Sequence, residues 1–172
     1  MPIDYFSNDP GISYKTEPKI AGQLYTISKT GFDSNVWVSF DHGATNYLLF
    51  TTSFFDVSDI KSFPNNPNMV WVLISDGYVS EIHQIDFSNL SDIQTQTISL
   101  PYTGATALSF QFNLANQQEA MVALGPKVLK TVDGGLSWGE YTNGLDMLQF
   151  DDLIFQINQN PLNNSQYTIA TT

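Results

Sequence analysis

Residues 131–138 read TVDGGLSW, and residues 39–46 read SFDHGATN. Both stretches have a hydroxyl residue, an aspartate, a glycine and a second hydroxyl residue at the same spacing. A short carboxylate can accept hydrogen bonds from the backbone N–H groups of a tight turn, and glycine tolerates the positive φ that such a turn requires. Each stretch therefore predicts a tight turn between two strands.

The two stretches belong to a longer repeat. Asp41 and Asp133 are 92 positions apart, and two Asn-Pro turns contain Pro67 and Pro161, which are 94 positions apart. These two landmarks predict units of about 46 residues, a length typical of the four-stranded blades of a β-propeller.

Short runs of alternating apolar and polar residues occur within these units, rich in Val, Ile, Thr and aromatic residues and separated by Pro, Gly and Asn. We therefore expect an all-β chain of antiparallel four-stranded blades, about three and a half in number, that form an incomplete ring and a single domain (1–172) or part of one. The blades are expected at residues 11–54, 57–101, 104–145 and 150–172. The strands are expected at residues 11–16, 23–28, 36–40, 47–51, 59–63, 69–75, 78–84, 95–100, 107–112, 120–124, 128–132, 139–142, 152–157 and 167–171.

The two stretches resemble the Asp box, or bacterial neuraminidase (BNR) repeat, whose pattern is Ser/Thr-x-Asp-x-Gly-x-Thr/Ser-Trp. The C-terminal stretch matches every defined position, with Thr131, Asp133, Gly135, Ser137 and Trp138. The N-terminal stretch matches all but the last, with Ser39, Asp41, Gly43 and Thr45, while Asn46 replaces the tryptophan. In the second blade only Asp86 of the box remains. The resemblance implies an Asp-box β-propeller.

The box aspartates are interpreted as structural groups. We expect Asp133 to accept hydrogen bonds from backbone N–H groups of its own turn, so that its replacement by alanine destabilises the protein. Ser137 and Thr45 can bond the turn backbone, and Trp138 can cover the hairpin with apolar area. A catalytic role for these aspartates is the weaker alternative.

Charge and composition exclude several classes of function. The chain has 17 acidic and 6 basic residues, a formal net charge of −11, no arginine and no cysteine. Such an acidic surface repels nucleic acids and anionic membranes, and the absence of cysteine removes disulfides and thiolate chemistry. Residues 1–6 lack the features of a secretory signal, and the apolar run at 69–74 is too short for a membrane helix. The expected setting is a virion, or the extracellular space or cell surface.

Catalysis is a second hypothesis to weigh. Sialidases that share the Asp box grip their substrate with arginines, which this chain lacks. Related propellers cleave plant glucans with two acidic residues, for which Asp59 and Asp152 are the candidates here. Their equivalent places in the repeat favour a structural role instead. The only histidines, His42 and His83, show no metal-ligand spacing, so we expect neither a metal nor a cofactor.

The sequence thus predicts a non-catalytic structural or recognition module that contacts proteins or, as a further ligand class, glycans. The alternative is a fragment of a secreted Asp-box glycoside hydrolase or carbohydrate-binding propeller. Because the fourth blade has only two strands, its edge requires completion. The missing strands are expected from residues 2–8, from a second copy or another protein, or from a continuation beyond Thr172, with intermolecular completion favoured.

Overall fold

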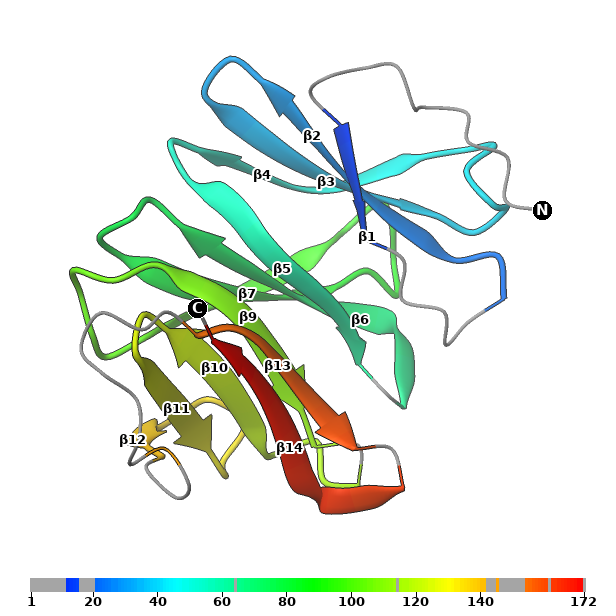
Figure 1. Cartoon of the computed structure of the whole chain (residues 1–172). Helices are drawn as coiled ribbons and strands as arrows, with labels where there is room; N and C mark the ends of the chain where they lie inside the picture. Colours follow the sequence, from blue (N-terminus) through cyan, green and yellow to red (C-terminus); the bar gives the residue numbers. More distant parts are fainter. Residues whose placement is uncertain are drawn as a thin grey trace. The chain divides into compact units, whose positions relative to one another are not determined.

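The computed structural model describes residues 12–15, 21–63, 65–113, 115–141, 145, 154–160 and 162–171. The described part is all-β and contains no helix, and its strands pair in antiparallel fashion (Figure 1). The chain divides into two compact units, Met1–Asp56 and Val57–Thr172. In the described ranges no helix is long and apolar enough to cross a membrane.

The first unit is one four-stranded sheet with the strands in sequence order. Its strands are β1 (Ile12–Lys15), β2 (Leu24–Thr30), β3 (Asp33–Ser39) and β4 (Tyr47–Ser53). Tyr25 lies opposite Val38 and Ile27 lies opposite Val36, so these four buried side chains share one face of the sheet. The alternation in the sequence thus becomes a one-sided apolar layer.

The second unit contains two further four-stranded sheets and one pair of strands. The first sheet comprises β5 (Asp56–Phe63), β6 (Asn66–Ser75), β7 (Ser80–Asp86) and β8 (Gln94–Ser99). The next comprises β9 (Ala107–Phe112), β10 (Ala120–Leu124), β11 (Lys127–Thr131) and β12 (Gly139–Glu140), and the pair is β13 (Ile154–Asn160) with β14 (Asn163–Thr171). The predicted architecture of four-stranded blades followed by half a blade is confirmed.

Several bounds of the predicted strands differ from the structure, and two of the differences have a clear local cause. The strand expected to begin at Tyr78 begins at Ser80, because Asp76 accepts the N–H groups of Tyr78 and Val79 and so extends the turn. In addition, β6 begins at Asn66 and β14 at Asn163, an offset of 97 residues where the proline landmarks gave 94.

The asparagine side chains explain this second difference. Asn66 Oδ1 accepts the N–H of Asn68, and Asn163 Oδ1 accepts the N–H of Ser165, so each asparagine closes the same kind of local turn at the start of its strand.

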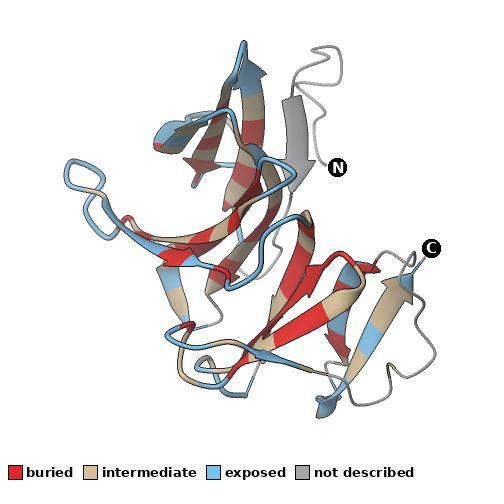
Figure 2. Cartoon of the chain, turned by 90° about the vertical axis from the view of Figure 1, so that its left-hand side faces the viewer, coloured by how far each residue is buried: buried red, intermediate tan, exposed pale blue. Residues whose placement is uncertain are grey.

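The core of the second unit explains the composition of its strands. All five residues of β10 are buried. Ala120, Val122 and Leu124 pack in a cluster shared with β6, β7 and β9, whereas Met121 and Ala123 pack in a cluster with β13. A strand with both faces covered loses the alternation of polar and apolar residues, and Figure 2 shows such fully buried strands beside exposed turns.

Aromatic rings fill the first of these clusters. Phe63 and Trp71 come from the β5–β8 sheet, and Phe110 and Phe112 come from β9. The Trp71 and Phe112 ring centroids lie 4.6 Å apart in an edge-to-face arrangement, and those of Phe63 and Phe112 lie 4.9 Å apart. Edge-to-face packing adds a directional term to the burial of apolar area and fixes how the two sheets stack.

Candidate functional site

The turn between β11 and β12 is closed by two side chains. The Thr131 hydroxyl donates to Asp133 Oδ1 at 2.7 Å and accepts the backbone N–H groups of Asp133 and Gly135 at 3.3 and 2.9 Å. Asp133 accepts the backbone N–H of Ser137 at 2.9 Å and the Ser137 hydroxyl at 2.5 Å. The backbone hydrogen bond predicted for Asp133 within its own turn is present.

The turn between β3 and β4 repeats this network. Ser39 donates to Asp41 Oδ1 at 2.8 Å and accepts the Gly43 N–H at 2.8 Å, while Asp41 Oδ1 accepts the Thr45 N–H at 2.8 Å. Asn46, which stands where the other turn has tryptophan, donates from Nδ2 to the Gly43 carbonyl at 3.4 Å. The two turns therefore share one hydrogen-bonded arrangement despite their different last residue.

Hydrogen bonds lower the pKa of both box aspartates from 3.8 to about 2. For Asp133 the largest cause is the Ser137 hydroxyl, followed by the Ser137 N–H; for Asp41 it is the Thr45 N–H. Both carboxylates are thus ionised at neutral pH. They are poorly suited to donate a proton, which is what a general acid must do.

The box glycines have the same backbone conformation but different surroundings. Gly43 and Gly135 both have φ +94°. A Cβ on Gly43 would meet only Leu24 Cδ1, at 3.7 Å, whereas a Cβ on Gly135 would lie 3.0 Å from Ile98 Cδ1. Ile98 belongs to β8 of the preceding sheet, so the turn at Gly135 also serves as a contact between sheets. Trp138 packs, partly buried, against the same core.

A reduced version of the turn follows β7. Asp86 accepts the Ser88 N–H at 2.9 Å and the Ser88 hydroxyl at 2.6 Å, and the pKa of Asp86 is lowered chiefly by that hydroxyl. The Phe87 N–H donates to the Asn68 carbonyl at 2.9 Å. The aspartate that the sequence retained therefore still organises a turn.

That last backbone bond occurs in all three of the four-stranded sheets. His42, the residue after Asp41, donates its N–H to the Gly22 carbonyl at 3.0 Å, and Gly134, the residue after Asp133, donates to the Gln118 carbonyl at 2.9 Å. Each bond ties the turn after a third strand to the beginning of the second strand. Sequence reasoning missed this link because it involves only backbone atoms.

Asp59 is buried, with 2 % of its surface exposed. Its Oδ2 accepts the Phe110 N–H at 3.2 Å and the Ser109 hydroxyl at 3.3 Å, its Oδ1 accepts the Ile60 N–H at 3.0 Å, and Lys61 Nζ lies 3.9 Å from Oδ2. Because Phe110 and Ser109 lie on β9, this carboxylate joins the first strands of two successive sheets.

The same connection continues to the next sheet. The Ser109 hydroxyl oxygen accepts the Ile157 N–H of β13 at 3.4 Å. We call Asp59, Ser109 and the Ile157 N–H the first-strand relay. Ser109 was not predicted as a site residue. The signal that could have found it is its place directly before Phe110 in β9, which matches the place of Asp59 directly before Ile60 in β5.

Asp152, the other proposed member of an acid pair, lies outside the described residues. By the bonds of the first-strand relay, Gln156 holds in β13 the position that Asp59 holds in β5. Gln156 precedes the buried Ile157, just as Asp59 precedes the buried Ile60.

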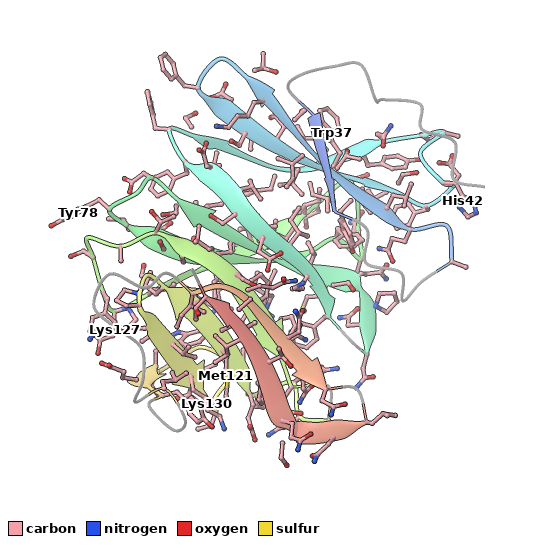
Figure 3. The ribbon with its side chains drawn as sticks, viewed as in Figure 1. Trp37, His42, Tyr78, Met121, Lys127 and Lys130 are labelled. Atoms are coloured by element: carbon pink, nitrogen blue, oxygen red, sulfur yellow. The ribbon has the colours of Figure 1, made fainter. Side chains whose placement is uncertain are left out.

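The two histidines lie in different units. His42 lies in the turn after β3, with φ +60° (Figure 3). His83 lies on β7, where Nε2 is 3.2 Å from Glu81 and Nδ1 is 3.3 Å from Thr97 Oγ1, and burial lowers its pKa. Among the described residues, no three His, Cys, Asp or Glu side chains gather in a way that could hold a metal ion.

Comparison with known proteins shows the fold and not the family. No protein-family model matches the chain, and no curated protein matches it. A GH74 enzyme of Niastella koreensis is similar in structure, with a TM-score of 0.66, 14% identity, and coverage of 92% of this chain and 27% of that one. An ancestral GH74 enzyme has a TM-score of 0.53, 17% identity, and coverage of 77% of this chain and 18% of that one.

A third structure, YCF48 bound to D1 peptide, has a TM-score of 0.47 and 14% identity, and the match covers 87% of this chain and 58% of that one. The chain thus spans about a quarter of the GH74 enzyme of Niastella koreensis and less of the ancestral one. The two GH74 enzymes are β-propellers, and the chain has a propeller-like fold. The Asp box remains a resemblance of residues.

Ser137→Ala should raise the pKa of Asp133 toward its ordinary value, because it removes the largest cause of the depression. Thr45→Ala should raise the pKa of Asp41 less, because there the Thr45 N–H is the largest cause and it survives the substitution. Carbon-detected NMR titration of the aspartate carboxyl groups measures both values.

A depressed pKa contributes stability above the unfolded value of 3.8 that is lost as the pH falls through about 2. Ser137→Ala should therefore reduce stability at neutral pH and weaken the loss on acidification. Equal pKa shifts in the two variants would contradict this account.

Gly135→Ala should destabilise more than Gly43→Ala, by about 1 kcal/mol, because only Gly135 approaches a neighbouring sheet too closely for a Cβ. The shared φ makes Gly43→Ala the matched control for backbone strain. Amide hydrogen exchange in each unit measures the two losses, and equal losses would show that the contact with Ile98 carries no energy.

Proposed function

We propose that this chain is a non-catalytic β-propeller module that binds other proteins, and that the open edge of β14 is its binding element. The observation that carries the proposal is the strand count: in the described part of the chain, three sheets have four strands and the β13–β14 sheet has two. The strand β14 spans nine residues, Asn163–Thr171, and is an edge of this sheet.

The edge of β14 has the chemistry of a strand acceptor. An edge strand presents unpaired N–H and C=O groups on one side, which can pair with a strand of another chain. The sequence of β14, NNSQYTIAT, contains no charged residue and no proline that would oppose such pairing. Main-chain hydrogen bonds provide the attraction, so the acidic surface does not prevent it.

The engagement of the acidic side chains supports a non-catalytic role. Asp41 and Asp133 hold their own turns, and Asp59 holds the β9 backbone. A general acid or base must be free to exchange a proton with a substrate. The carboxylates that sequence reasoning brought forward, as far as they are described, already have structural partners.

As a setting we propose a virion or a surface assembly. The support is the charge: at −11 and without arginine, the chain is repelled by nucleic acids and anionic membranes and is left to bind proteins or glycans. Immunogold labelling of the native particle or cell surface tests the setting.

A second candidate is a piece of a longer glycoside hydrolase. The fold likeness to the GH74 enzymes favours it, since the chain covers only 27% of the first and 18% of the second. In that case the acidic pair would be completed by residues of the longer protein.

Thr168→Lys should abolish association through β14, because a lysine on an edge strand opposes the approach of another strand. Gln96→Lys is the matched control, since Gln96 is also exposed on an edge strand, β8 of a complete sheet. Sedimentation velocity over a range of concentrations, together with hydrogen exchange of residues 167–171, measures the effect.

The wild-type chain should self-associate or bind a partner with protection of the 167–171 amides, and only Thr168→Lys should remove it. A monomer at all concentrations whose β14 edge gains no protection from any binding partner would contradict the proposal.

The purified protein should hydrolyse neither a sialoside nor a β-glucan. Chromogenic glycoside substrates and reducing-end assays measure this, with Asp59→Asn and Asp152→Asn as variants and Asp86→Asn, on a surface turn, as the control. Turnover that disappears in Asp59→Asn or Asp152→Asn, but persists in Asp86→Asn, would establish the hydrolase alternative.

A further inference from the structure

Two phenylalanines of the first unit are exposed to solvent and stack on each other. Phe32, in the turn between β2 and β3, is 77% exposed, and Phe54, just after β4, is 73% exposed. Their ring centroids are 5.3 Å apart and their planes are 25° from parallel. We call these two rings the aromatic pair. Two exposed rings stacked on each other form a small contiguous apolar patch, and such patches are the ones that mark interaction sites.

The backbone at Phe54 supplies a second, independent observation. Phe54 has φ +69°, in the left-handed region that bulky side chains avoid, and its N–H donates to the Phe32 carbonyl at 2.9 Å. The Ser34 hydroxyl donates to the neighbouring Phe55 carbonyl at 2.9 Å, which holds this segment in place. Backbone strain of this kind is held by the surrounding hydrogen bonds and clusters at functional sites, so it supports a role for this segment.

The second unit provides an internal comparison. Tyr78 lies 46 positions after Phe32, and each residue follows a glycine in the turn between the second and third strands. The Tyr78 carbonyl accepts the N–H of Gly104 at 2.7 Å, and Gly104 has φ +82°. The second unit therefore has an unstrained glycine where the first unit has a strained phenylalanine, although the backbone bond is the same.

We propose that the aromatic pair is a docking site for an arginine-bearing segment of another protein. A guanidinium group stacks on aromatic faces and pairs with carboxylates, and it is more weakly hydrated than an ammonium group. In the sequence Asp33 directly follows Phe32, and Asp56 follows Phe54 by two residues; Asp33 Oδ1 accepts the Ser53 hydroxyl at 2.6 Å.

Charge complementarity favours this occupant. The chain has a net charge of −11 and no arginine of its own. Lys29 forms an ion pair with Asp56, and in the described part of the first unit no cation lies over either ring of the aromatic pair.

In the second unit a lysine of the chain itself binds both an aromatic ring and a carboxylate. Lys127 Nζ lies 4.8 Å from the centroid of the Tyr102 ring, and the same lysine pairs with Glu140 at 2.9 Å. Figure 3 shows Lys127 and Tyr78 near the turns of this unit. A cation over an aromatic ring, paired at the same time with a carboxylate, is therefore an arrangement that this chain already uses. In the described part of the first unit Lys29 pairs with Asp56 but does not lie over either ring, so a cation over the aromatic pair would come from another molecule.

This docking site is independent of the β14 edge, because it lies in the other unit and uses side chains rather than backbone groups. The two proposals fail separately: Thr168→Lys leaves the aromatic pair intact, and substitution of Phe54 leaves β14 intact.

The test uses the whole chain and a short arginine-containing peptide, with the same peptide carrying citrulline, the neutral isostere, as the control ligand. The readout is the shift of the ¹H–¹⁵N signals of residues 31–33 and 54–56 during titration. The arginine peptide should move these signals in a saturable manner, and the citrulline peptide should not.

Phe54→Gly and Phe32→Ala should each abolish the response. Phe54→Gly should leave the unfolding midpoint unchanged or higher, because glycine accepts the left-handed conformation, so a lost response cannot be attributed to unfolding. Tyr78→Ala, at the equivalent turn of the second unit, is the matched control and should respond like the wild type.

Three results would overturn the proposal. They are an equal response to both peptides, a response that survives in Phe54→Gly, and shifts spread over the whole acidic surface. Saturable shifts at residues 31–33 and 54–56 with a β-glucan oligosaccharide, and none with the arginine peptide, would assign the pair to glycan binding instead.

Discussion

A buried carboxylate, Asp59, is the constraint on which the second unit depends. It lies on a first strand, and it accepts the backbone N–H of Phe110 and the hydroxyl of Ser109 from the first strand of the next sheet. Ser109 in turn accepts the N–H of Ile157 from the sheet after that. Without these acceptors, buried amide groups on strand edges would lack partners, at a cost of about 1–3 kcal/mol each. The relay therefore fixes how three sheets stack, and the apolar residues of β10 can then divide between two cores.

The Asp-box turns act at a different level. Each closes its own hairpin through one hydroxyl and one carboxylate, and the link from the following residue to the start of the second strand fastens the turn to its sheet. The turn at Gly135 also reaches a neighbouring sheet of its own unit, through Ile98. Local hydrogen bonds thus shape each blade, whereas buried contacts between blades assemble the unit. Carboxylates serve in both tasks: Asp41 and Asp133 close turns, and Asp59 joins two sheets.

The blades and the box turns could be predicted from the sequence, because both depend on local patterns of residues. Alternation gave the strands, and the spacing of Thr131, Asp133 and Ser137 gave a network that forms within eight residues. The relay could not be predicted, since it joins residues about 50 positions apart whose pairing depends on how the sheets stack. The offset between β6 and β14 that the prolines predicted was three residues too short. The turns at the start of these strands are closed by asparagine side chains and not by the prolines. The exposure of Phe54 was missed because an aromatic residue beside a strand is usually part of the core.

Amide hydrogen exchange at Phe110 and Ile157 tests the central claim most directly. Both N–H groups bond to side chains of a preceding sheet rather than to a strand of their own sheet. The account predicts slow exchange of both amides in the wild type, faster exchange of Phe110 in Asp59→Ala, and faster exchange of Ile157 in Ser109→Ala, while amides within the β10–β11 ladder stay protected. Rapid exchange of both amides in the wild type, or protection that neither substitution changes, would contradict it.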